Sequence, residues 1–168
     1  MNYFELFSLP VSLKIDTAQL QKTYYRLCRE FHPDHAATDA QEQAMHQTAD
    51  IHKARETLSK PELRLAYLLK INGMMEEDEK YKLPASFLGQ MMDINEAAME
   101  LSGSPDDVAT QALQQDIEQC HATIYQPVAA YFTADELTLT AQDLSALQLY
   151  YYQQKYLQRV QDSIEKTK

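Results

Sequence analysis

Apolar side chains recur along the N-terminal part of this chain at the intervals of an amphipathic helix. Residues 2–8 form a short apolar segment that Pro10 stops, and Asp16 or Thr17 can cap a longer helix behind it. Within that helix, positions i, i+4, i+7 and i+11 predict a core stripe, made of Leu20, Tyr24, Leu27 and Phe31. Pro33 ends the helix, so residues 32–40 are expected to form an exposed loop.

The pattern predicts further helices up to the C-terminus. A helix over 41–59 precedes one that Ser59 can cap, with Pro61 in its first turn and Gly73 just past its end. The next runs from Pro84 to about Leu101. Two more follow: one that starts at Ser104-Pro105-Asp106-Asp107 and is broken at Pro127, and one over 141–165 that comes after the capping-box spacing at 133–136.

Composition and charge refine this picture. Three glycines, no tryptophan and many helix-forming residues favour an all-α fold over a sheet. Residues 1–72 contain nine Lys/Arg and nine Asp/Glu, whereas residues 73–168 contain six and sixteen, so the net charge of −10 lies entirely in the second part. An acidic surface repels phosphate backbones, and nucleic acid is therefore not an expected partner.

The remaining composition predicts a cytoplasmic protein. Cys28 and Cys120 are far apart and form no metal-binding pair, which favours a reducing compartment. The first residues lack the basic region of a signal peptide. No apolar run approaches membrane-spanning length, so no membrane is expected among the partners.

The candidate functional residues lie on the long N-terminal helix and directly after it. Lys22, Arg26 and Arg29 recur at i, i+4 and i+7 on one face, and the exposed triplet His32-Pro33-Asp34 follows. Asp34 could make a charge-assisted hydrogen bond to a partner arginine, while the three cations steer an acidic surface. The basic face by itself could also be an ordinary solvated helix face.

Two features of this region resemble a J domain. One is the triplet His32-Pro33-Asp34 between two predicted helices, and the other is the pattern Ala54-x-x-x-Leu58-Ser59-x-Pro61-x-x-Arg64-x-x-Tyr67. The opening residues Tyr3-Phe4-Glu5-Leu6-Phe7-Ser8-Leu9-Pro10 and the acidic helical second half resemble the HscB family of iron–sulfur biogenesis J proteins. The likeness covers essentially the whole chain. One departure is His35, where many J domains have a lysine.

The resemblance implies a co-chaperone without enzymatic activity or cofactor of its own. J domains dock on a seventy-kilodalton heat-shock chaperone, here HscA- or DnaK-like, and stimulate its ATP hydrolysis. The resemblance assigns the chaperone-binding role to the triplet and the basic face, namely His32, Pro33, Asp34, Lys22, Arg26 and Arg29.

The predicted helix 84–101 contains two apolar sets. Phe87, Met91, Ile94, Ala98 and Leu101 form a core stripe, and Leu88, Met92 and Met99 form a second set beside acidic residues. The second set indicates either burial between two neighbours or an exposed surface. In HscB-like proteins the C-terminal bundle binds the iron–sulfur scaffold protein, and the resemblance assigns that role to Leu88, Met92, Asp93, Glu96, Glu100 and Tyr156.

The sequence therefore predicts a J domain over 1–73, a charged linker over 74–83 and a three-helix client-binding domain over 84–168, in an L-like arrangement. Two alternatives stay open. One is a general J protein that serves another client. The other is a metal-dependent hydrolase that uses the histidines and carboxylates, although the chain has no HExxH motif and no dense ligand cluster. The spacing of His32 and His35 resembles that of metal ligands, but Pro33 argues against their alignment on a helix, and no metal site is expected.

Overall fold

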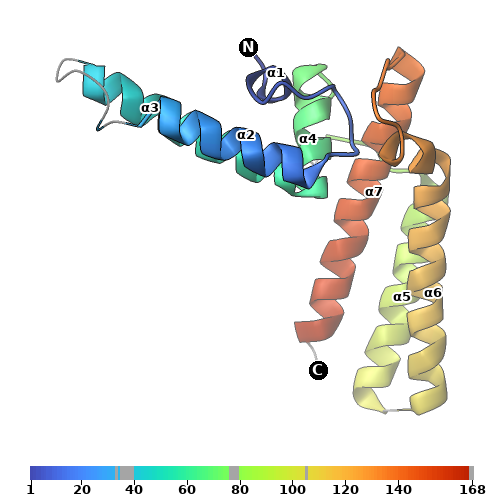
Figure 1. Cartoon of the computed structure of the whole chain (residues 1–168). Coiled ribbons are helices and arrows are strands. Elements are labelled where there is room, and N and C mark those ends of the chain that lie inside the picture. The colour runs from blue at the N-terminus through green and yellow to red at the C-terminus, as the bar shows by residue number, and fades with distance from the viewer. Residues whose placement is uncertain (33, 35–39, 76–79, 105, 167–168) are drawn as a thin grey trace. The chain divides into compact units, whose positions relative to one another are not determined.

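The computed structural model describes residues 1–32, 34, 40–75, 80–104 and 106–166, and in these residues every regular element is helical (Figure 1). The elements are α1 (Tyr3–Leu6), α2 (Thr17–Glu30), α3 (Gln41–Ser59), α4 (Pro61–Ile71), α5 (Ala85–Gly103), α6 (Asp107–Tyr125), the 3-10 helix η3 (Gln126–Phe132) and α7 (Ala141–Lys166). The predicted all-α class is thus confirmed. The chain divides into two compact units: Met1–Gly73 with Ala130–Leu139 (unit 1), and Met74–Ala129 with Thr140–Lys168 (unit 2).

Unit 1 is organised around the helical hairpin of α2 and α3, against which α1 and α4 pack. Asp16 caps α2 by accepting from the backbone N–H groups of Ala18 and Gln19. The buried stripe of α2 passes through Leu20, Thr23 and Leu27, whereas Tyr24 and Phe31 are only half-buried. The shared core is completed by side chains of the other three helices and of Phe7, the residue after α1; the helical ones are Phe4, Ile51, Ala54, Leu58, Leu65, Leu68 and Leu69.

The motif residues of α3 and α4 are structural. Ala54 and Leu58 are fully buried, and Pro61 is the first residue of α4, where its missing N–H costs nothing. The Tyr67 ring stacks on Tyr3 with 4.3 Å between centroids, and its hydroxyl oxygen accepts from the Tyr3 backbone N–H at 2.9 Å. Tyr67 therefore holds α1 against α4.

Arg64 is 94% buried by residue surface, and burial lowers the pKa of its guanidinium. Its Nε has no hydrogen-bond partner among the described residues. This motif arginine is thus an interior residue and is not displayed for a partner.

Unit 2 is a bundle in which α5, α6 and α7 pack pairwise. Its core contains Phe87, Met91, Ile94, Leu113, Cys120, Ile124, Leu157 and Val160. The Tyr81 ring stacks on Tyr152 at 4.2 Å and so fastens the chain before α5 to α7. The Gln148 amide nitrogen donates to the Met74 carbonyl at 2.6 Å and fastens the beginning of this unit in the same way.

The segment 130–139 packs with unit 1. The predicted C-terminal domain over 84–168 includes this segment. The Leu137 N–H donates to the Val11 carbonyl at 2.8 Å, and the Ser12 hydroxyl donates to the Ala134 carbonyl at 2.7 Å. These backbone groups have no helical partners, so they are satisfied by the irregular segment 9–15.

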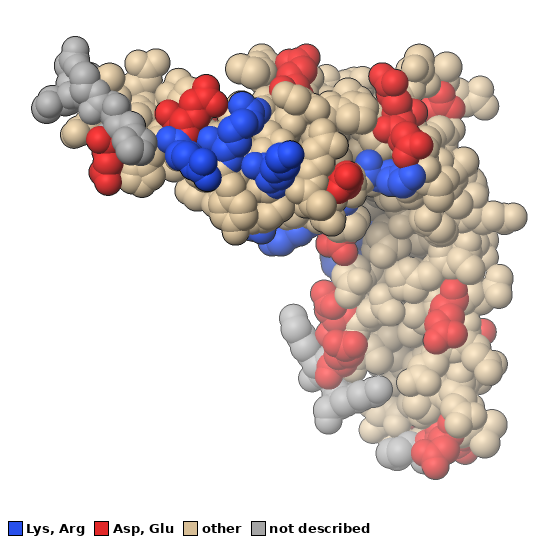
Figure 2. All heavy atoms as spheres, in the orientation of Figure 1, with Lys and Arg blue, Asp and Glu red and all other residues tan. Residues whose placement is uncertain are grey.

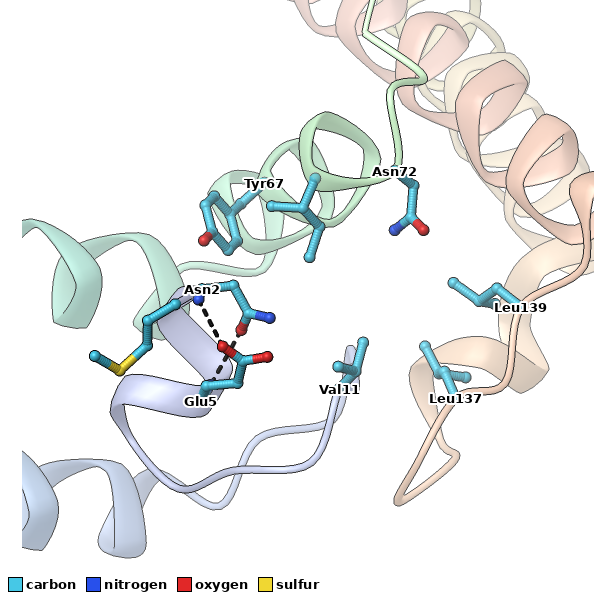
Figure 3. Close-up of a pocket in the computed structure, with 9 residues that line it drawn as sticks. Asn2, Glu5, Val11, Tyr67, Asn72, Leu137 and Leu139 are labelled. Atoms are coloured by element: carbon cyan, nitrogen blue, oxygen red, sulfur yellow. Dashed lines mark hydrogen bonds between the residues drawn. The ribbon is translucent and has the colours of Figure 1, made fainter.

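A pocket of about 620 Å³ lies within unit 1 beside this segment (Figure 3). Leu137, Leu139 and Val11 face it from one side, and Tyr67 of α4 and Asn72 just after α4 face it from another. Asn2 and Glu5 also line it, and they are joined by the reciprocal hydrogen bonds of a capping box at the start of α1.

Ser12→Ala is expected to destabilise the protein by about 1–3 kcal/mol. The Ser12 side chain is fully buried, and its hydroxyl also accepts from the Lys14 N–H at 2.8 Å, so the substitution leaves two backbone groups without a partner. Urea unfolding followed by circular dichroism measures the loss. Ser145→Ala, on an exposed turn of α7, is the control and is expected to stay within about 0.5 kcal/mol of the wild type.

Three expected helix starts differ from the observed ones. Ser59 does not cap α4; Lys60 occupies that position and makes no side-chain capping hydrogen bond. Within the predicted start at residues 104–107, the residue that caps α6 is Asp106 and not the first residue, Ser104. The capping box before α7 is formed by Thr140 and Asp143 and not at residues 133–136, because the latter segment is held by unit 1.

Candidate functional site

The basic face of α2 is displayed on the surface of unit 1. Lys22, Arg26 and Arg29 are all exposed, and Figure 2 shows Lys and Arg side chains gathered over this helix. Arg26 lies 3.4 Å from Glu30 one turn further on. An exposed pair of this kind contributes only a few tenths of a kcal/mol, so Arg26 remains available to a partner carboxylate.

Tyr25 belongs to the same surface and was missed by the sequence analysis. Its side chain is 59% exposed, and it lines a shallow hollow of about 500 Å³ together with Lys22, Arg26, Arg29 and Glu30. Its position three residues after Lys22 and four before Arg29 was the available signal. An aromatic ring among cations offers apolar contact area at a charged interface.

The opposite side of α2 is joined to α3. The Tyr24 hydroxyl and His52 Nδ1 are hydrogen-bonded at 2.8 Å, and the Arg55 guanidinium lies over the Tyr24 ring at 5.2 Å. Desolvation, and then the neighbouring Cys28 thiol, raises the pKa of Tyr24. These contacts set which face of α2 points away from the hairpin.

The loop after α2 begins at a defined place. The Phe31 N–H donates to the Leu27 carbonyl, and the Thr48 hydroxyl of α3 donates to the Phe31 carbonyl at 2.9 Å. One orphan carbonyl at the end of α2 is thereby satisfied, and the start of the loop is tied to the hairpin.

His32 and Asp34 are both exposed, with 50% and 85% of their side-chain surfaces accessible. His32 Nδ1 accepts from the Asp34 backbone N–H at 3.2 Å, which requires this nitrogen to be unprotonated. The same atom lies 3.6 Å from Asp34 Oδ2. The two side chains form an ion pair only when the imidazole ring is protonated and positively charged. Pro33 and His35, also part of the prediction, lie outside the described residues.

In unit 2, the two apolar sets of α5 that the sequence distinguished differ in burial. Phe87, Met91 and Ile94 are buried, whereas Met92 and Met99 are 69% and 74% exposed. The predicted acidic residues Asp93, Glu96 and Glu100 are exposed on the same helix. This combination of flexible thioethers and carboxylates is typical of an adaptable binding surface.

Leu88 and Tyr156 occupy a different environment from Met92. Both are half-buried and pack against the core of unit 2, and Tyr156 meets Phe87 edge-to-face with 6.0 Å between ring centroids. Truncating either residue would disturb the core as well as the surface. Met92 and the carboxylates are therefore the better probes of the predicted client-binding surface.

Gly89→Ala is expected to stabilise the protein by about 0.5–1 kcal/mol, because glycine is a poor helix former. Gly89 lies within α5, and an added Cβ meets nothing within 4 Å. Gly73→Ala is the contrasting variant. Gly73 has a φ of +70°, so alanine there is strained and is expected to destabilise the protein. Urea unfolding of both variants measures the two signs; an unchanged or lower stability of Gly89→Ala would contradict the argument.

Within the described ranges, no group of three or more His, Cys, Asp and Glu side chains is placed to hold a metal ion. The same residues include no helix that is long and apolar enough to span a membrane.

Comparison with known proteins relates both units to one family. Residues 2–67 match the DnaJ domain, and residues 83–165 match the HSCB C-terminal oligomerisation domain. A co-chaperone protein HscB homolog of Aeromonas hydrophila is 33% identical over 98% of this chain and 98% of its own length. The chain belongs to the HscB family of J-domain co-chaperones.

Further relatives support this membership. The HscB homolog of Shewanella baltica is 31% identical over 98% of this chain and 99% of its own length. The structure of chaperone HscB from Vibrio cholerae matches with a TM-score of 0.77 and 25% identity over 98% of this chain and 96% of that one. Human co-chaperone protein HscB shares the fold, with a TM-score of 0.73 at 24% identity over 98% of this chain and 81% of that one.

Membership of the HscB family decides between the classes of function that the sequence left open. The family is one of co-chaperones and not a known class of enzymes, and the matches give no support to a metal-dependent hydrolase. A J-domain co-chaperone implies a seventy-kilodalton chaperone as partner.

Proposed function

We propose that this protein stimulates ATP hydrolysis by a seventy-kilodalton chaperone through unit 1 and delivers an iron–sulfur scaffold protein that is bound to unit 2. One observation carries the first half of the proposal. The exposed Asp34 carboxylate directly follows a helix whose displayed face contains Lys22, Arg26 and Arg29.

The chemistry of the chaperone side favours docking by charge. Asp34, with 85% of its side chain accessible, can accept a charge-assisted hydrogen bond from a chaperone arginine. The cations of α2 raise the association rate with an acidic surface, and Tyr25 adds apolar contact among them. Pro33 is the middle residue of the proposed docking triplet. A proline restricts the backbone of the residue before it, and such a restriction lowers the conformational entropy that is lost on docking.

The client side has the opposite charge. Asp93, Glu96 and Glu100 surround Met92 on α5, and Leu88 and Tyr156 contribute the inner edge of the proposed client face. A client with lysine or arginine next to apolar side chains matches this surface. The two units thus offer surfaces of opposite charge, which suits two partners that are held at the same time.

Single-turnover ATP hydrolysis by the chaperone tests the proposal, measured with the chain alone, with the scaffold protein alone and with both. We expect the chain to accelerate hydrolysis and the scaffold to increase the rate further. If the chain accelerates ATP hydrolysis but the scaffold protein does not increase the rate further, the proposed J-domain function is retained and the scaffold protein is rejected as the client. No acceleration of any seventy-kilodalton chaperone from the same organism would reject both.

A further inference from the structure

The three helices of unit 2 leave a hollow between them at one end of the bundle. The last turns of α5, the first half of α6 and the last turns of α7 line it, and its volume is about 720 Å³. In Figure 1, α5 and α6 continue past the last turn of α7, so the core at this end lacks the cover of the third helix.

The floor of this hollow, hereafter the end groove, is apolar and incompletely covered. Ala98, Leu101, Ile117 and Ile164 line it and pack against the core while they remain only partly buried. Met99 forms one edge and is 74% exposed. Such a surface gains free energy when an apolar side chain covers it.

The charge at the end groove has one sign. Glu118 of α6 and Glu165 of α7 are exposed and supply its charged side chains, and no lysine or arginine is among the described residues that line it. This local charge follows the excess of acid in residues 73–168, which contain sixteen Asp/Glu and six Lys/Arg. An occupant with positive charges beside an apolar side chain complements both features.

The end groove is continuous with the proposed client face. Met99 lies seven residues after Met92 and three after Glu96 on α5, so the three side chains share one side of the helix. A partner segment that lies along Met92 and Glu96 reaches the groove by following the same helix for about two turns.

We infer that the end groove binds an apolar segment, flanked by lysine or arginine, of the same client protein that contacts Met92 and Glu96. The inference rests on the proposed function, because the occupant belongs to the client. A second copy of this chain fits less well, since a symmetric contact would bring Glu118 and Glu165 against the same acids.

Calorimetric titration of the full chain with the iron–sulfur scaffold protein of the same organism tests the inference. Met99→Lys and Glu118→Lys each place a positive charge at the groove, and both are expected to weaken binding about tenfold. Val108→Lys and Asp116→Lys are the matched controls on exposed positions of α6 outside the groove, and are expected to stay within about twofold of the wild type. Circular dichroism verifies that all four variants are folded.

The outcomes separate this inference from the proposed function. If both groove variants bind like the wild type while reversal of Glu96 and Glu100 abolishes binding, the end groove is not part of the client site and the proposed function stands. If Met99→Lys lowers the molecular mass of the protein in sedimentation but leaves scaffold binding unchanged, the occupant is a second copy of this chain and the inference is overturned. A wild type that does not bind the scaffold at all overturns both.

Discussion

Asp34→Asn is expected to abolish stimulation of the chaperone's ATP hydrolysis while the protein stays folded. The side chain is 85% exposed, and its carboxylate lies 3.6 Å from His32 Nδ1. Removing the charge therefore changes the stability by no more than about 0.5 kcal/mol. Thermal unfolding of the variant, followed by circular dichroism, checks this point before any activity is measured.

The functional loss is expected to be much larger than the structural one. Truncating one partner of a desolvated, hydrogen-bonded charge pair at an interface costs roughly 2–5 kcal/mol, which corresponds to binding weakened about 30-fold or more. The amide of asparagine keeps the shape of the side chain but cannot offer the anionic acceptor that a partner arginine requires. Single-turnover hydrolysis at subsaturating co-chaperone concentration is the most sensitive measurement.

Asp50→Asn provides the matched control for this experiment. Asp50 is an exposed carboxylate on α3, in the same unit but outside the basic face and the loop. It is expected to stimulate hydrolysis like the wild type. Equal stimulation by a folded Asp34→Asn variant would mean that the loop does not dock as proposed.

Glu96→Lys combined with Glu100→Lys is expected to weaken scaffold binding by about 100-fold, since like charges brought together at an interface cost several kcal/mol. Both carboxylates are exposed, one turn apart on α5. The fold is expected to survive, because neither side chain belongs to the core of unit 2. Stimulation of the chaperone in the absence of client is expected to stay unchanged, since that activity is assigned to unit 1.

The combined variant Asp116→Lys with Asp162→Lys controls for the change in total charge. It alters the net charge by the same amount at exposed positions of α6 and α7. If both double variants lose binding equally, the effect is one of overall charge, and α5 does not form a specific client face. If only the α5 variant loses binding, titration of Met92→Ala then measures the apolar contribution at the 69% exposed thioether.

The helices could be predicted from the sequence because their signals are local. The spacing of Leu20 and Leu27, the cap at Asp16 and the proline at the start of α4 act within one or two turns. The basic face of α2 follows from the same periodicity, and it emerged on the surface as expected. Exposure of His32 and Asp34 could be anticipated because proline disfavours continuation of the helix.

The burial of individual side chains needed the packed structure. The pattern placed Tyr24 in the core stripe, but Thr23 is the buried residue, because Tyr24 turns toward His52 and Arg55 of α3. Likewise, Leu88 and Met92 belong to one apolar set in the sequence. In the folded bundle Leu88 packs against the core of unit 2 and is half-buried, whereas Met92 stays exposed. A helical period defines a face but not the neighbour that covers it.

By itself, therefore, the sequence determined the all-helical class, the hairpin of α2 and α3 with the exposed His32 and Asp34 after α2, and the separation of a neutral first part from an acidic second part. The tertiary structure alone decided that residues 130–139 join unit 1 and that the capping box before α7 lies at Thr140. The physical reason is the range of the interactions. Helix signals act between neighbours in the chain, whereas the bond from Ser12 to Ala134 joins residues 122 positions apart and exists only once the chain has folded.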